Sequence, residues 1–318
     1  MSSTRARALL ALKGMTMGMA EVVPGVSGGT IAFITGIYER LINAIKSFGP
    51  IAVAGYRSGG PVGLWRAVDG TFLLTLLAGM IGGIVIGIFG ITYLLENFPL
   101  EVWGFFFGLI AASAIYVGRQ VPRWRWRELL ALVVAAIFAY TLTVMSPARG
   151  TDAYWMLFFS GALAVSALLL PGLSGSFVLL LMGMYRIVTG TMRRILEGPT
   201  GADLLRMLVF GLGMVVGVVT FSRLFSWTFK RYESLTLATL TGFMIGSLNK
   251  VWPWRNVLTY REDSHGKQVP FLEEAVLPGQ YAGEADVLWV VLWALIGFVG
   301  VFLLERLGEG TEAEVLTD

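Results

Sequence analysis

The chain has 318 residues, of which 56% are hydrophobic and only 14% are charged, and its formal net charge is +3. Soluble domains carry about 25% charged residues, so this composition excludes an ordinary soluble domain and predicts one integral membrane domain, 1–318. The absence of cysteine excludes disulfide bonds, thiolate catalysis and cysteine-ligated metal. A small positive charge is typical of basic cytoplasmic ends and does not indicate nucleic-acid binding.

Several segments are long and apolar enough to cross a membrane. A helix needs about 20 apolar residues to span a hydrocarbon core of ~30 Å. We expect such helices, in chain order, at 71–95, 102–117, 129–145, 204–225, 235–248 and 287–304. The predicted fold class is therefore all-α, a polytopic transmembrane helical bundle.

Two further hydrophobic regions, 9–45 and 154–192, are each interrupted near the middle. The interruptions read PGVSGG at 24–29 and PGLSGS at 171–176. Proline removes a backbone donor and glycine permits positive φ, so both sequences end a helix within an apolar stretch. We expect a pair of half-helices in each region, separated by what we call the first break (24–29) and the second break (171–176).

The two broken regions belong to an internal repeat. Six residues of the first region recur in the second at a constant interval of 147 residues. They are Pro24, Gly25, Ser27, Gly28, Gly36 and Tyr38, which match Pro171, Gly172, Ser174, Gly175, Gly183 and Tyr185. Gly79, Met80 and Gly108 match Gly213, Met214 and Gly242 at an interval of 134. The sequence thus predicts two related halves, 9–145 and 152–304, each with one broken segment followed by three helices.

The relative orientation of the halves depends on the broken segments. If each enters and leaves by one face, three true crossings per half make the halves inverted; if each spans the membrane, four crossings make them parallel. The distribution of lysine and arginine fits both arrangements. We prefer the inverted one, because re-entrant half-helices in inverted repeats recur among transporters. The polar segment 250–286 is either a cap over a cavity or a solvated loop.

The breaks are the candidate binding site. Amide groups without helical partners at membrane depth require a polar environment, and helix N-termini attract anions, phosphate included. The alternative is that the breaks only bring glycine surfaces together. The residues that we predict to bind phosphate are Gly25, Ser27, Gly28, Gly29 and Thr30 of the first half and Gly172, Ser174, Gly175 and Ser176 of the second.

Four ionisable residues extend this candidate site. Glu21 lies three residues before the first break and would either take up a proton during transport or pair with an arginine. Arg40, Arg186 and Arg223 are suited to bidentate contact with phosphate, although arginines near helix ends also extend to the membrane interface.

Signatures of an enzyme are missing from the sequence. His265 is the only histidine, and neither a nucleophile elbow nor a nucleotide phosphate loop occurs. We therefore expect no catalytic activity, no metal and no cofactor, and transport would have to use an ion gradient.

A family resemblance rests on several short segments: Lys13-Gly14, Gly18, Ala20-Glu21, the run VPGVSGGT at 23–30, Gly36 to Tyr38, the run LPGLSGSF at 170–177 and Gly183 to Tyr185. In these segments the chain resembles the bacterial and archaeal polyprenyl-phosphate transporters, formerly a domain of unknown function. The resemblance covers nearly the whole chain. It departs at Glu21, where the family often has aspartate, and in the polar loop after Lys250.

This resemblance implies a multi-pass protein of the plasma membrane. Its task would be to return undecaprenyl phosphate from the outer to the inner leaflet after cell-wall or other glycan polymer synthesis. The half-helix N-termini would hold the phosphate, arginines would neutralise it, and Glu21 would couple transport to protons. A channel or exchanger for a small inorganic anion is the competing hypothesis. A lateral groove would favour the lipid and an ion-sized pore the ion. The oligomeric state and the polyprenyl chain length stay open.

Overall fold

The computed structural model describes residues 3–23, 26–148, 150–198, 200–262 and 268–315, which are mostly helical. The first half contains α1 (Ser3–Glu21), α2 (Gly28–Ile34), α3 (Tyr38–Lys46), α4 (Pro50–Ala67), α5 (Gly70–Asn97), α6 (Pro99–Arg119) and α7 (Trp126–Val144). The second contains α8 (Tyr154–Leu169), α9 (Gly175–Leu181), α10 (Tyr185–Glu197), α11 (Gly201–Arg231), α12 (Glu233–Ser247), β1 (Arg255–Glu262), β2 (Gln268–Ala275), the 3-10 turn η1 (Pro278–Gln280) and α13 (Val287–Val315).

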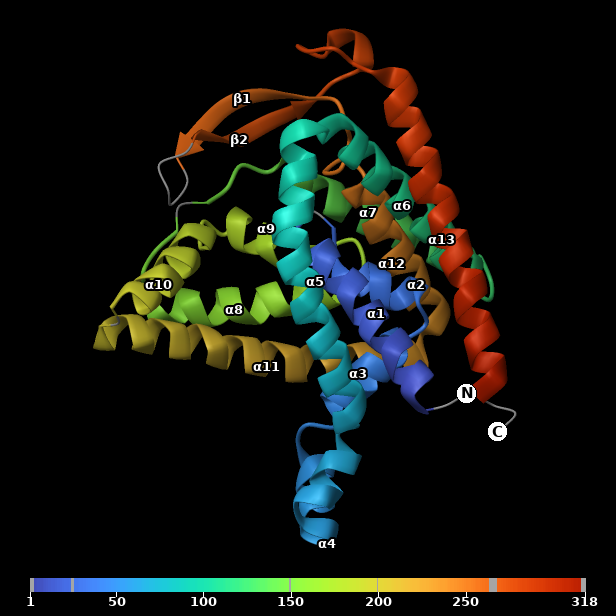
Figure 1. Cartoon of the computed structure of the whole chain (residues 1–318), viewed down its shortest axis with the longest axis vertical. Helices are drawn as coiled ribbons and strands as arrows, with labels where there is room; N and C mark the ends of the chain where they lie inside the picture. Colours follow the sequence, from blue (N-terminus) through green and yellow to red (C-terminus); the bar gives the residue numbers. More distant parts are fainter. Residues whose placement is uncertain (1–2, 24–25, 149, 199, 263–267, 316–318) are drawn as a thin grey trace.

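Length and apolar composition confirm the predicted transmembrane bundle. The stretch Pro50–Asn97, which comprises α4 and α5, and helices α6, α7 and α11 are each long and apolar enough to cross a membrane. In Figure 1, α5 runs along the long axis of the view, whereas α8 and α11 run across it.

The long helices pack in close pairs: α1 with α5, α8 with α11, α6 with α13, and α7 with α12. Glycines make these approaches possible. Gly14 of α1 lies against the Leu76 carbonyl of α5, and Gly161 of α8 lies against the Phe210 carbonyl of α11. A Cβ atom at either glycine would overlap that carbonyl oxygen, so backbone meets backbone as in other membrane bundles.

The matching contacts of the two halves keep the intervals found in the sequence. Gly14 and Gly161 are 147 residues apart, and the carbonyls they meet, those of Leu76 and Phe210, are 134 apart. Equivalent helices therefore pair in the same way within each half, which supports the proposed repeat.

Helix directions support inverted halves. The ring of Phe107, in α6, lies 5.4 Å from that of Trp252, which follows α12, whereas Gly118 at the end of α6 lies beside Thr241 within α12. Helices α6 and α12 therefore run antiparallel. Since Gly108 and Gly242 make them equivalent in the repeat, the antiparallel arrangement is the one that inverted halves require.

Each broken segment returns to the end of the bundle from which it starts. Helix α1 runs parallel to α5, because Gly79 lies beside Ala11 and Gly83 beside Met15. After the break, Arg40 of α3 pairs with Asp69, the residue that precedes α5, at 2.7 Å. This course is the one that a re-entrant segment requires.

The second half repeats this course. Helix α8 runs parallel to α11, because Gly213 lies beside Phe158 and Gly217 beside Ala162. Helix α10 bends away from α9 by 109°. Its Arg194 pairs at 2.9 Å with Asp203, near the start of α11.

Two elements differ from the sequence-based expectations. Helix α4, which projects from one end of the bundle in Figure 1, fills a stretch where no helix was expected, and it is bent at Gly59 and Gly60. The polar segment after Lys250 contains an antiparallel hairpin, β1–β2, at the opposite end of the bundle. Its base is anchored because the indole N–H groups of Trp252 and Trp254 donate to the carbonyls of Val276 and Ala285.

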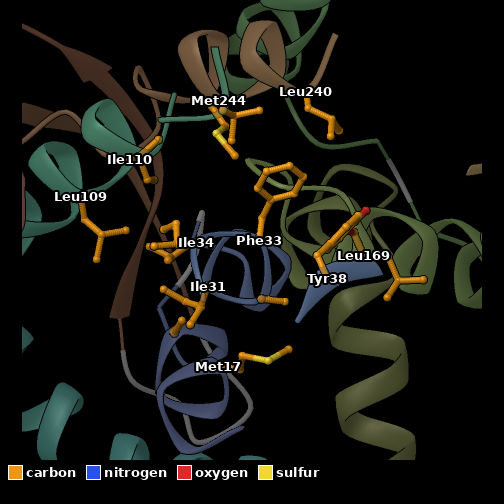
Figure 2. Close-up of a cluster of buried hydrophobic side chains, with 14 of the residues drawn as sticks. Met17, Ile31, Phe33, Ile34, Tyr38, Leu109, Ile110, Leu169, Leu240 and Met244 are labelled. Atoms are coloured by element: carbon orange, nitrogen blue, oxygen red, sulfur yellow. The ribbon is translucent and has the colours of Figure 1, made fainter. Parts of the chain in front are cut away.

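The main hydrophobic core surrounds the first half-helix pair. All seven residues of α2 are buried. Figure 2 shows Ile31, Phe33 and Ile34 of α2 among apolar side chains from α1, α6 and α12. The ring of Tyr38 packs 5.3 Å from that of Phe33. Helix α2 therefore lies at the centre of the bundle.

Two adjacent glycines of α5 test the close packing of helices. A Cβ at Gly83 would overlap the Met15 carbonyl, whereas a Cβ at Gly82 would meet nothing within 4 Å. We expect Gly83→Ala to destabilise the purified protein by about 1–3 kcal/mol through overpacking. Gly82→Ala should be neutral or slightly stabilising, because alanine is the better helix former. Thermal unfolding in detergent measures both; equal melting temperatures for the two variants would contradict this packing.

Candidate functional site

The two breaks meet in the interior, and Ser27 makes the first contact. Its buried hydroxyl donates toward the carbonyls of Leu168 and Leu170, at 3.1 and 3.2 Å. Because α8 ends at Leu169, these carbonyls lie where helical partners run out. The Ser27 oxygen also accepts from the Gly29 amide at 3.1 Å and so caps α2.

Two more side chains of the first half complete this junction. The Gly172 amide donates to the hydroxyl of Thr30 at 3.1 Å, and the hydroxyl of Tyr38 donates to the Leu169 carbonyl at 2.9 Å. Gly172 has φ +85°, which only glycine adopts without strain. Side chains of the first half therefore hydrogen-bond the backbone at the end of α8 and at Gly172 of the second break. We call this set of contacts the junction.

Glu21 lies at the edge of the junction. Its Oε1 atom accepts from the Gly28 amide at 2.6 Å. A carboxylate at the start of α2 benefits from the partial positive charge of the free amides there. Of the two roles expected for Glu21, pairing with an arginine is thus replaced by pairing with a backbone amide.

The second break is built differently from the first. The hydroxyls of Ser174 and Ser176 lie 2.9 Å apart, and Ser174 makes no side-chain cap on α9. Gly175 is buried against the Ala164 carbonyl. Within α9 only Gly175 and Phe177 are buried. The second half-helix is therefore much less enclosed than α2.

The structure brings most of the predicted glycines and hydroxyl residues together but not the arginines. Gly29 packs against the Leu169 carbonyl, whereas Gly25 lies outside the described residues. The Arg40 side chain is 59% exposed and pairs with Asp69.

The two remaining arginines are exposed as well. Arg186 is exposed in the first turn of α10, and Arg223 is exposed on α11, with its guanidinium beside Gly49. Their positions in the sequence did not reveal this, because side-chain direction depends on tertiary packing.

An apolar groove opens beside the bundle. Its volume is about 650 Å³, and it lies between the end of α5 and the starts of α6 and α13. Phe98, Phe105, Trp289 and Trp293 contribute to its walls. Sequence reasoning missed the groove, because it forms between segments nearly 200 residues apart. Among the residues that the structure describes, no cluster of three acidic or histidine side chains suits a metal ion.

Comparison with protein families decides the assignment. The model of a family described as undecaprenyl phosphate translocase-like matches residues 17–269, a range that includes both breaks. The chain belongs to this family. The family resemblance found in the sequence is thereby confirmed. No solved structure matches the chain.

Two curated relatives support the same assignment. A polyprenyl-phosphate transporter of Vibrio cholerae is 43% identical over 85% of this chain and 85% of its own length. A polyprenyl-phosphate transporter of Staphylococcus aureus is 29% identical over 76% of this chain and 85% of its own length. Both names describe transporters rather than enzymes, as expected for this chain. Together with the apolar helices they identify a multi-pass protein of the bacterial plasma membrane.

Ser27 and Ser174 form a matched pair for testing the junction. Ser27→Ala removes the cap of α2 and leaves the carbonyls of Leu168 and Leu170 without their donor, so we expect a loss of about 1–3 kcal/mol of stability. Ser174→Ala removes only the contact with Ser176 and should cost clearly less. Thermal unfolding of both variants in detergent measures the difference. A larger loss for Ser174→Ala would be inconsistent with the junction.

Proposed function

We propose that this protein moves polyprenyl phosphate across the membrane, returning the carrier lipid from the outer to the inner leaflet for reuse. The observation that carries the proposal is the family match over both breaks. The names of both curated relatives, polyprenyl-phosphate transporter, support the substrate class.

The phosphate headgroup would pass the junction of the two breaks. This is a group of hydroxyl and amide donors, Ser27, Thr30 and Gly172 among them, inside an otherwise apolar bundle. Polar backbone at membrane depth is tolerated where it lines a pathway. Ser174 and Ser176 would add donors from the second half. Arg40, Arg223 and Arg186 would serve on the approaches, since they lie exposed near the returning helices.

The isoprenoid tail would stay in an apolar environment during transport. The groove of about 650 Å³ beside α5, α6 and α13 supports this, because aromatic and aliphatic side chains dominate its walls. A small inorganic anion has no apolar part that could bind to such a surface, so the groove favours the lipid over the ion.

The basic residues support an orientation. Arg125 and Arg127 lie at the start of α7, and Lys230 and Arg231 lie at the end of α11. Cytoplasmic ends of membrane proteins are enriched in lysine and arginine. This end would face the cytoplasm, and the β hairpin, near the other end of α7, would face outward.

Glu21 would couple the lipid to protons. Its carboxylate is bound to the Gly28 amide at the start of α2, within the junction. A phosphate that approaches this amide competes with the carboxylate, and protonation of Glu21 removes the competing charge. Movement of one half against the other would then expose the junction to each face in turn, as in other transporters with inverted repeats.

Exchange of undecaprenyl phosphate between leaflets of protein-containing liposomes tests this function. We expect the wild-type protein to accelerate exchange and to respond to a pH gradient. Glu21→Gln should slow exchange several-fold and abolish the response to the gradient. Glu39→Gln is the matched control, because Glu39 lies exposed on α3.

Two results would contradict the proposal. Chloride flux without lipid exchange would identify a transporter of small anions instead. Lipid exchange that Glu21→Gln leaves fully responsive to the pH gradient would remove Glu21 from the coupling mechanism.

A further inference from the structure

A second cavity, of about 420 Å³, lies under the β hairpin. Its walls come from the ends of α7 and α12, from α9 and from both strands of the hairpin. Of the two roles expected for the polar segment, the structure therefore favours a cap over a cavity. We call this space the hairpin cavity.

Two partly buried cations line the hairpin cavity. The side chains of Lys250 and Arg255 are 18% and 9% exposed. The Nε atom of Arg255 is buried and has no hydrogen-bond partner among the described residues, whereas its Nη1 and Nη2 atoms donate to the backbone carbonyls of Asn249 and Glu273. Lys250 lies over the ring of Phe177, with its Nζ atom 5.3 Å from the ring centroid. Such buried cationic groups are costly unless an anion compensates them.

One carboxylate serves both cations, and it does so at long range. Glu273 Oε2 lies 3.4 Å from Arg255 Nε and 3.8 Å from Lys250 Nζ, beyond the length of a good charge-assisted hydrogen bond. Glu274 also lines the hairpin cavity but is exposed. Burial lowers the pKa of the Lys250 ammonium, and Arg255 lowers it further while Glu273 opposes the shift. An additional anion would stabilise the charged form of Lys250.

The hairpin cavity reaches the more open of the two half-helices. Phe177, Leu180 and Leu181 of α9 line it, and Phe177 directly follows the second break. The corresponding helix of the first half, α2, is entirely buried. Lys250 and Arg255 therefore line a cavity that borders α9, next to the second break.

The walls of the hairpin cavity combine charge with apolar surface. Val144 and Met145 at the end of α7 and Leu258 on β1 are all more than half exposed. An inorganic ion needs only the charges, whereas a lipid phosphate uses both kinds of surface.

We propose that the hairpin cavity is a binding site for the phosphate headgroup of a polyprenyl phosphate, where Lys250 and Arg255 hold the headgroup before it reaches the junction. The inference rests on the proposed function and adds the place at which the lipid is first bound. Glu273 pairs with both cations when no phosphate is bound, and the phosphate displaces it when the lipid binds.

Binding of undecaprenyl phosphate to the protein in nanodiscs tests the site. Lys250→Met and Arg255→Gln should each weaken binding about tenfold or more, since each removes a charge-assisted contact to phosphate. Glu273→Gln should strengthen binding, because it removes the competing carboxylate; a gain of affinity cannot come from misfolding. Arg193→Gln is the control, since Arg193 is half exposed on α10 and pairs with Glu197.

Inorganic phosphate is the second probe. We expect it to compete only weakly, because it lacks a tail for the apolar wall. Competition as strong as binding of the lipid itself would overturn the assignment to a lipid headgroup. Unchanged lipid affinity in both Lys250→Met and Arg255→Gln would overturn the site altogether.

Site-directed labelling gives an independent readout, because the chain has no natural cysteine. A single cysteine from Leu180→Cys should react with a membrane-impermeant maleimide, and undecaprenyl phosphate should protect it. Labelling that the lipid leaves unchanged would contradict the site. If wild type exchanges the lipid while these tests fail, only this inference is wrong; if wild type neither binds nor exchanges it, the proposed function fails first.

Discussion

The structure depends on how the second break satisfies its backbone inside an apolar bundle. Helix α8 ends at Leu169, so the last carbonyls of the helix have no helical partners. The interior of a bilayer holds no water that could donate hydrogen bonds to them. Ser27, Thr30 and Tyr38 of the first half supply those bonds instead. The interior of one half is therefore completed by side chains of the other. A bundle held together in this way cannot open at the junction without exposing several polar groups at once.

Glycine allows the rest of the bundle to form around that junction. Membrane helices gain little from the hydrophobic effect when they associate, so close van der Waals contact has to replace it. Gly14 and Gly161 bring the first helix of each half against the long helix that follows. The broken segments are thereby held against the long helices, and Ser27 and Thr30 of the first segment are buried in the interior.

Departures from symmetry are the features that bear on transport. Helix α2 is enclosed and carries Glu21 at its start, whereas α9 borders the hairpin cavity. The position of Glu21 corresponds to Leu168 in the second half, so only one break has a carboxylate of its own. In this conformation the first half-helix after the break, α2, is buried, whereas most of α9 is not.

The amino-acid sequence alone predicted the class of protein, two breaks in apolar segments and a repeat that relates the two halves. These are properties of composition and interval, which hydropathy and the chemistry of proline and glycine fix locally. It did not determine that Thr30 meets Gly172 or that Arg40 turns to Asp69, because such partners depend on the packing of segments far apart in the chain. The sequence did not predict the hairpin cavity either. Lys250 and Arg255 look like ordinary loop charges until the fold buries them beside α9, and burial is a property of the whole molecule.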